Sequence, residues 1–173
     1  MLFRSDQFPL FAKLYGTGAV AGPLRFQDLA LSDLEGTLRW VKPARKSGLS
    51  KTGFSVDVRA LGSTPGSLND SLFQPRDEQT QANARLRFFG GDLPAPIEQP
   101  VTVSGSLYRL ASAPASFSLR NSPDGLFTGS FLDPASGKVA RFRGVIVGKA
   151  QRAAGFFVGA GTAGGVELVP GYR

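Results

Sequence analysis

The chain contains no cysteine and no histidine, and it has only one tryptophan and one methionine among its 173 residues. Without cysteine there are no disulfide bonds, no thiol catalysis and no cysteine-ligated metal sites. Without histidine the chain lacks the commonest metal ligand and the usual general base at neutral pH. Together the two absences argue against an enzyme, and we expect no catalytic residues, no metal and no cofactor.

Long hydrophobic runs are also missing. No segment approaches the roughly 18 consecutive apolar residues that a membrane-spanning helix requires. Residues 1–6 carry an acid and a base and lead into no apolar stretch, so they do not resemble a signal peptide. We expect this start to lie inside a longer reading frame, with any export signal outside the given sequence.

Phenylalanine, glycine, proline and basic residues are abundant instead. The chain has 14 Phe, 22 Gly and 12 Pro, a hydrophobic content of 42% and a net charge of +7. Frequent glycine and proline indicate many short elements joined by tight turns, and phenylalanine packs well on strands. The positive charge favours attraction to polyanions, although a basic surface also keeps a protein soluble.

Alternation of apolar and polar residues recurs along the chain, whereas sustained helical periodicity is almost absent. In residues 54–60, for example, Phe54, Val56 and Val58 alternate with polar neighbours. Residues 75–84 are the only helix-compatible segment, and because they are polar we predict a loop there. We predict strands at 8–15, 34–42, 54–60, 84–89, 101–110, 116–120, 126–132, 139–147, 155–158 and 166–169.

The order of sequence features near the start is repeated near the end, which indicates an internal repeat. In 8–62 and again in 115–170, a strand with an internal glycine is followed by a basic loop and then by Gly-Phe-x-Val. We therefore predict one domain over 1–173, with the two halves joined by a central segment, 63–114.

Glycines lie inside several of the predicted strands, namely Gly36, Gly105, Gly129 and Gly144. Glycine weakens a strand unless a bulge, a corner or a closely approaching chain needs the space, and repeated strand glycines allow a curved sheet to close. We predict an all-β fold, an antiparallel barrel or barrel-like sandwich of about 10–12 short strands, built from two similar halves.

The sequence GLFTGSFLDPASGK at 125–138, followed by FRGVI at 142–146 and GFFVG at 155–159, resembles a known bacterial domain. This is the glycine- and aromatic-rich β-domain near the C-terminus of many large exported proteins, especially of Verrucomicrobia and Planctomycetes. LEGTLRWVKP at 34–43 is similar to the first half of that domain. The resemblance implies an extracytoplasmic module, secreted or at the cell surface, within a longer chain, and it supplies no catalytic residues.

Two sequence features contain the residue types of a catalytic site or a nucleotide-binding site but lack the surrounding structure that such a site needs. Asp33 and Glu35 lie about 6.6 Å apart on one face of a strand, a spacing a glycosidase pair could have, but such a pair is more often a solvated sheet face, here beside Arg39, and we do not expect catalysis from it. The glycines of 16–22 lack the following helix of a dinucleotide-binding loop.

A Ser–Lys catalytic pair is formally available near residue 50. Ser47 or Ser50 has Lys46 or Lys51 close in the sequence. These residues lie in a predicted loop, where catalytic groups are poorly preorganised, so we do not expect catalysis there.

A basic run beside the only tryptophan is the candidate ligand-binding site. A cationic loop next to an exposed aromatic ring suits a sulfated or carboxylated glycan, or a nucleic-acid strand. The alternative interpretation is a solvated loop with the tryptophan in the core beside Leu34 and Leu38. The candidate residues are Arg39, Trp40, Lys42, Arg45 and Lys46.

We expect a non-catalytic structural or interaction module of a larger exported or cell-surface bacterial protein. One alternative is a carbohydrate- or polyanion-binding domain that uses the basic run, and a second is a carrier of a small apolar ligand in a barrel cavity. The partners are then a glycan, another polyanion or other domains of the parent protein. Nucleic acid is not expected, because Arg85-Leu-Arg87 and Arg141-Phe-Arg143 lack the exposed-aromatic signature of RNA-recognition modules.

Overall fold

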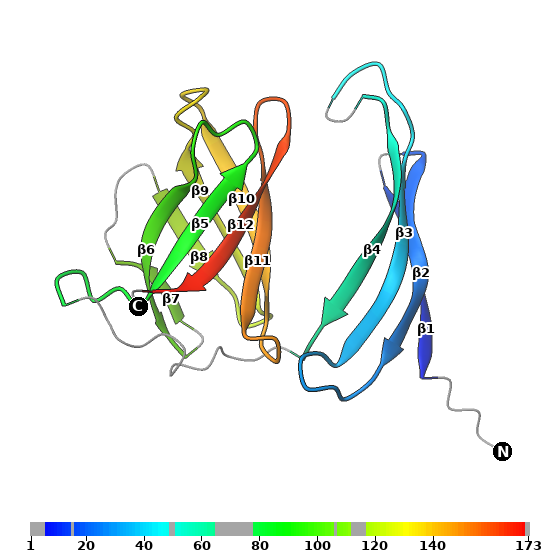
Figure 1. Cartoon of the computed structure of the whole chain (residues 1–173), viewed down its shortest axis with the longest axis horizontal. Coiled ribbons are helices and arrows are strands. Elements are labelled where there is room, and N and C mark those ends of the chain that lie inside the picture. The colour runs from blue at the N-terminus through cyan, green and yellow to red at the C-terminus, as the bar shows by residue number, and fades with distance from the viewer. Residues whose placement is uncertain are drawn as a thin grey trace. The chain divides into compact units, whose positions relative to one another are not determined.

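The chain is an all-β protein with twelve strands (Figure 1). The computed structural model describes residues 6–14, 16–48, 51–64, 78–105, 107–111 and 117–171, and these contain no helix. The predicted fold class and strand number are therefore confirmed. In this part of the chain no helix is present that would cross a lipid bilayer.

The strands form two compact units, residues 1–64 and 65–173. The first predicted repeat half, 8–62, supplies all the strands of the first unit, whereas the second, 115–170, supplies only part of the second unit. The central segment contributes the remaining strands of that unit. The similarity of the two halves stays a prediction.

The first unit is an antiparallel sheet of four strands in the order β1-β2-β3-β4. Each strand pairs with the next one along the chain, so the sheet is a simple meander with β1 and β4 at its edges. The strands are β1 (Gln7–Leu14), β2 (Gly18–Phe26), β3 (Leu34–Lys42) and β4 (Phe54–Gly62).

The second unit is an antiparallel sheet of eight strands in the order β7-β6-β5-β12-β11-β10-β9-β8. Its outermost strands, β7 and β8, contact each other, so the sheet curls into a nearly closed barrel. Near-closure leaves only two short edges available for unwanted pairing. The strands are β5 (Ala84–Gly90), β6 (Ile97–Ser104), β7 (Leu107–Leu110), β8 (Phe117–Asn121), β9 (Leu126–Leu132), β10 (Val139–Val147), β11 (Arg152–Val158) and β12 (Ala163–Pro170).

The first and last strands of the barrel are neighbours. Ala84 of β5 is paired with Pro170 of β12, and the N–H of Gly171 donates a hydrogen bond of 2.7 Å to the carbonyl of Asn83. The chain therefore enters and leaves the barrel at one place.

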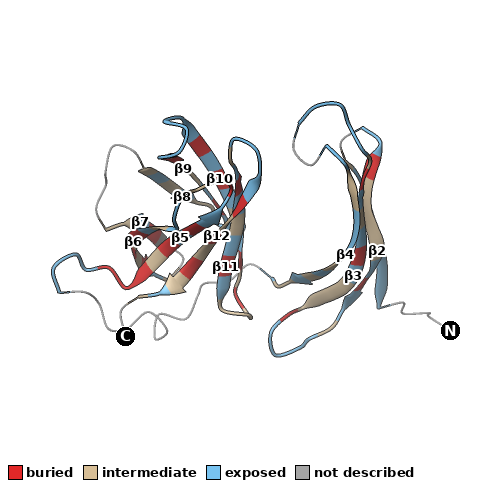
Figure 2. Cartoon of the chain, turned by 45° about the horizontal axis from the view of Figure 1, so that its top comes forward, coloured by how far each residue is buried: buried red, intermediate tan, exposed pale blue. Residues whose placement is uncertain are grey.

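Phenylalanine rings fill the barrel, as the composition predicts. Phe88, Phe131 and Phe157 are fully buried, and the ring centroids of Phe131 lie 4.6 Å from Phe88 and 5.1 Å from Phe157. Figure 2 shows the buried residues as bands across the barrel strands, while the four-stranded sheet is mostly intermediate or exposed. The tilted and edge-on contacts between these phenylalanine rings stabilise the barrel beyond the burial of their apolar surface.

Each of several glycines lies directly across from a large apolar side chain that covers it. In the barrel, Gly144 is paired with Phe127, Gly129 with Phe142, and Gly164 with Phe157. A β-carbon on these glycines would lie 2.2, 2.3 and 2.2 Å from the respective phenylalanine rings. The strand glycines thus make room for rings that lie flat on the neighbouring strand, which also lets the sheet bend.

In the first sheet, leucine side chains cover glycines of the neighbouring strand in the same way. Leu24 is paired with Gly36, and a β-carbon there would lie 2.9 Å from the leucine side chain. Leu38 covers Gly22 in the same way, at 3.1 Å. Leu24 and Leu38 are also the buried hydrophobic residues of this sheet, so the glycine contacts account for most of its packing.

The structure corrects two predicted elements. The single strand predicted at 101–110 is a hairpin, because Gly105 has a φ of +58° and turns the chain between β6 and β7. Strand β2 was not predicted, since its glycines and Pro23 hide its alternation; the glycine-rich segment 16–22 belongs to the β1–β2 hairpin. Of the predicted loop at 75–84, residues 75–77 lie outside the described residues, 78–80 form a turn, and β5 begins at Ala84.

Two aspartates hold turns of the barrel. The carboxylate of Asp92 accepts hydrogen bonds from the backbone N–H groups of Gly161 (2.6 Å) and Thr162 (2.9 Å) and from the Thr162 hydroxyl. These bonds hold the pKa of Asp92 below its usual value of 3.8. Hydrogen bonds from the Ser136 hydroxyl and the Ala135 N–H likewise lower the pKa of Asp133.

The glycine–ring pairing predicts that Gly164→Ala destabilises the barrel by about 1–3 kcal/mol, because the new methyl group overlaps the Phe157 ring. Combining it with Phe157→Leu should cost about 0.5–3 kcal/mol less than the sum of the two single changes, since the smaller side chain vacates the space. Urea unfolding of the four proteins measures this coupling. Strictly additive costs would show that Gly164 does not serve to seat the ring.

The hydrogen bonds to Asp92 predict a pH effect with a definite sign. Because the folded-state pKa lies below the unfolded value, ionised Asp92 stabilises the fold above about pH 4, and the contribution is lost as the pH falls through the folded pKa. Asp92→Asn should lower the Tm at neutral pH and make its decline in acid shallower. Asp124→Asn, at an exposed side chain between β8 and β9, is the control and should lower the Tm at neutral pH much less than Asp92→Asn.

Candidate functional site

The strand register gives the four-stranded sheet one charged face and one apolar face. Side chains alternate between the faces along each strand. Arg25, Glu35, Arg39, Asp57 and Arg59 belong to the charged face. The apolar face carries the large apolar side chains of Phe8, Leu10, Leu14, Val20, Leu24, Phe26, Leu34, Leu38, Trp40, Phe54, Val56 and Val58, together with Lys42 at the end of β3.

Arg39, the first residue of the predicted ligand site, is held by a carboxylate on the charged face. Its Nε and Nη2 atoms donate to Asp57 Oδ1 and Oδ2 at 2.5 and 2.9 Å, a bidentate pair across β3 and β4. The two side chains are 60% and 53% exposed. A guanidinium held in this way has little capacity left for an external anion.

Trp40 and Lys42 lie on the opposite, apolar face. The Trp40 ring meets Phe54 edge-on, with centroids 5.1 Å apart, and its indole N–H is buried without a hydrogen-bond partner in the described part of the sheet. Lys42 is buried, with 7% of its surface exposed. This arrangement matches the alternative interpretation of the sequence, in which Trp40 shares a face with Leu38.

Arg45 and Lys46 are exposed on the segment after β3. The backbone N–H of Arg45 donates to the carbonyl of Lys51 at 2.8 Å, which ties the base of this loop. The structure therefore distributes the five predicted residues over two sheet faces and a loop, and it does not assemble them into one surface. Of the nearby serines, Ser47 is exposed and Ser50 lies outside the described residues.

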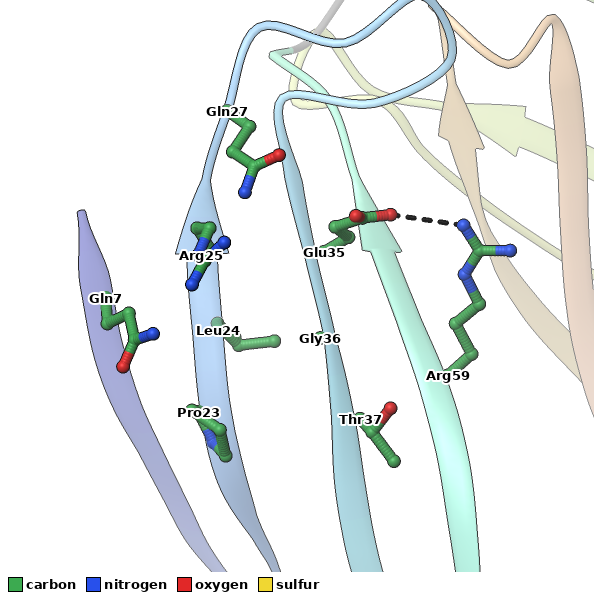
Figure 3. Close-up of a pocket in the computed structure, with 9 residues that line it drawn as sticks. All are labelled: Gln7, Pro23, Leu24, Arg25, Gln27, Glu35, Gly36, Thr37 and Arg59. Carbon is green, nitrogen blue, oxygen red and sulfur yellow. Dashed lines mark hydrogen bonds and ion pairs between the residues drawn. The ribbon is translucent and has the colours of Figure 1, made fainter.

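A hollow of about 450 Å³ opens on the charged face (Figure 3). Its polar groups come from three neighbouring strand positions, with Gln7 opposite Arg25 and Arg25 opposite Glu35. Glu35 accepts a hydrogen bond of 3.1 Å from Arg59 Nη2, and Figure 3 shows these two side chains directed toward each other. The hollow is polar and open, and its carboxylate is neutralised.

The predicted carboxylate pair, Asp33 and Glu35, does not form a catalytic arrangement. Asp33 Oδ2 accepts hydrogen bonds from the N–H (2.8 Å) and the hydroxyl (3.1 Å) of Thr64, so it anchors the chain that follows β4, while Glu35 is ion-paired. Among the described residues no three acidic side chains converge in a way that would hold a metal ion.

The void found among the core side chains of the barrel is too small for a ligand. The void among Leu86, Tyr108, Leu119, Phe127, Ala153 and Leu168 measures about 10 Å³. This is about the volume needed by one water molecule, whereas ligand sites measure roughly 300–1,000 Å³. The phenylalanine rings occupy the place that a small apolar ligand would need.

The outward face of β8–β11 is a basic surface that sequence reasoning missed. Arg120, Arg141 and Arg143 are exposed there, together with Phe156, which is 50% exposed. The alternation in Arg141-Phe142-Arg143 was a signal, but such a pattern is typical of any outward strand face. What distinguishes this surface is that side chains from four strands lie next to one another on it, and this arrangement depends on the strand register.

No family model matches this chain, and neither a curated protein nor a solved structure matches it.

The packing of Trp40 predicts a blue-shifted fluorescence emission with weak quenching by iodide. Phe54→Ala should shift the emission to longer wavelength and increase quenching, because the Phe54 ring covers an edge of the indole. Val41→Ala, on the opposite face of the same strand, should leave both unchanged. Strong iodide quenching of the wild-type protein would instead place Trp40 at the surface, as the ligand-stacking interpretation requires.

Proposed function

We propose that this chain is a non-catalytic structural or interaction module of a larger exported or cell-surface bacterial protein. The observation that carries the proposal is the apolar face of the β1–β4 sheet. The N-terminal unit has no second layer of its own among its described residues, and a sheet with one apolar face is stable only when that face packs against something.

The most exposed part of the apolar face is aromatic. Phe8 and Phe26 are 47% and 59% exposed, and their ring centroids lie 6.5 Å apart. Val56 on β4 is 42% exposed. Exposed aromatic side chains grouped on one face are characteristic of protein–protein contact surfaces.

The size of the face suits a protein partner. Four strands spaced about 4.8 Å apart, each about nine residues long, span roughly 600 Å². A standard protein interface buries about 800 Å² on each partner. A neighbouring β-layer of similar width would therefore cover most of the face.

The charges of the described residues support a non-catalytic role. The carboxylates of Glu35, Asp57, Glu98 and Glu167 are ion-paired with arginines, and those of Asp33, Asp92 and Asp133 accept turn hydrogen bonds. Groups used in this way stabilise structure, and catalysis needs a nucleophile or base directed into a cleft. With histidine and cysteine absent, the usual partners for such groups are missing as well.

Both alternative functions are disfavoured by the geometry of the described residues. A polyanion-binding site made of Arg39, Trp40, Lys42, Arg45 and Lys46 is disfavoured by their separation over two faces and a loop. The carrier alternative is disfavoured by the filled barrel. The extracytoplasmic location rests on the resemblance of residues 125–159 and 34–43 to the exported bacterial domain and remains part of the proposal.

The proposal predicts that the isolated chain binds the hydrophobic dye ANS through the apolar face while it remains folded. Phe8→Gln with Phe26→Gln should reduce the dye fluorescence several-fold, because both rings are exposed and their loss removes apolar surface without opening a core. Phe11→Gln with Leu61→Gln is the matched control. Those side chains are 71% and 43% exposed on the charged face, and their loss should have little effect.

The dye experiment also has a contradicting outcome. A wild-type chain that unfolds cooperatively but does not enhance ANS fluorescence would show that the apolar face is already covered. The chain would then have no free surface of this kind for a partner, and the proposal would fail.

A further inference from the structure

The outward side chains of β8, β9 and β10 form cross-strand rows in which arginines flank hydroxyl groups. Thr128 is paired with Arg120 on one side and Arg143 on the other. In the next row, Ser130 is paired with Ser118 and Arg141. We call this surface, with Phe156 at its edge, the arginine face.

The strand geometry fixes the spacing of the three positive charges. Arg141 and Arg143 are two residues apart on β10, so their α-carbons lie about 7 Å apart, and Arg120 is two strands away from Arg143, at about 10 Å. All three side chains are exposed. The backbone therefore places the three arginine side chains at neighbouring positions of one sheet face, from which they can contact adjacent anionic groups of one polymer.

The three arginines of this face differ from several arginines on other sheet faces in their ion pairing. Arg39, Arg59, Arg85 and Arg87 each form an ion pair with a carboxylate. Within the described residues no ion pair involves Arg120, Arg141 or Arg143. Three like charges held close together repel one another, and an external anion relieves that repulsion.

Hydroxyl groups lie beside the arginines in both rows. The Oγ atoms of Ser118 and Ser130 are hydrogen-bonded at 2.9 Å, and the N–H of Ser130 donates to Ser118 Oγ at 3.0 Å. Thr128 is exposed in the neighbouring row. Hydroxyls both donate and accept, so they complement a ligand that itself carries hydroxyls.

The surface is hollowed over a long region. A depression of about 1120 Å³ runs over β8–β11, and its lining combines the three arginines with exposed apolar side chains, namely Leu126, Val139, Val145, Phe156 and Val158. This exceeds the size typical of small-molecule sites and suits a segment of an extended polymer.

The composition of the arginine face favours an acidic polysaccharide over a nucleic-acid strand. Surfaces that bind single-stranded nucleic acid stack successive bases on several aromatic rings. In this lining Phe156 is the aromatic residue that points outward. Phe89 lies on the other side of β12, where its ring packs against Gly165. Guanidinium groups bind carboxylates and sulfates in the same two-point manner.

We propose that the arginine face binds an acidic polysaccharide, with Arg120, Arg141 and Arg143 contacting its anionic groups and Thr128, Ser118 and Ser130 contacting its sugar hydroxyls. This inference is independent of the proposed docking through the apolar face. Failure of either one leaves the other standing, because the two surfaces belong to different sheets.

The test measures the affinity of the full chain for heparin, a sulfated probe, and for polygalacturonate, a carboxylated one. A variant carrying Arg120→Gln, Arg141→Gln and Arg143→Gln is compared with a loop variant carrying Arg45→Gln, Lys46→Gln and Lys51→Gln. Both lower the net charge by three, so a purely non-specific attraction affects them equally. We expect the first variant to bind at least one of the two probes about tenfold more weakly and the loop variant to bind almost as well as the wild type.

Two further measurements test whether a loss of affinity comes from the binding site and not from unfolding. Far-UV circular dichroism and Tm show whether each variant is folded. In the wild-type protein, mass spectrometry after arginine modification by phenylglyoxal should show Arg120, Arg141 and Arg143 protected when the probe is bound, which requires no variant.

Several outcomes would overturn the proposal. Equal loss of affinity in both variants would indicate that only net charge matters, and a larger loss in the loop variant would move the site to residues 45–51. Tighter binding of an oligo-dT strand than of either polysaccharide would assign the surface to nucleic acid. Weakening for heparin alone or for polygalacturonate alone would support the site and identify the anionic group.

Discussion

Both sheets depend on one kind of contact, in which a large apolar side chain lies flat on a glycine of the neighbouring strand. A ring or isobutyl group takes the space of the missing β-carbon, so the two strands approach without a void. At Gly129, Gly144 and Gly164 a single methyl group would overlap a phenylalanine ring. Because the same positions relieve crowding on the inner side of a curved sheet, they also set where the barrel bends.

The two units show what the size of the covering side chain does. In the barrel the covering residues are phenylalanines, which meet one another across the interior and form a filled core. In the N-terminal sheet they are leucines, which cover glycines of the neighbouring strand within one sheet. The same local contact is therefore part of a filled core in the barrel and of a single sheet in the N-terminal unit.

The sequence alone supports the fold class, the number of strands and most strand positions, because alternation and turn residues are local signals. It fails at β2, where glycines and Pro23 obscure the pattern, and at Gly105, where a positive φ turns one predicted strand into a hairpin. The candidate site was harder to predict from the sequence than the fold. Residues close in sequence, such as Arg39 and Trp40, point to opposite faces, whereas Arg120 and Arg143 meet only through the register of three strands.

The paired ends of the barrel have an architectural consequence. With Ala84 opposite Pro170 and Gly171 bonded to Asn83, the polypeptide arrives and departs at adjacent points. A unit built this way can be spliced into a surface loop of a host protein, or strung in tandem, without stretching its neighbours.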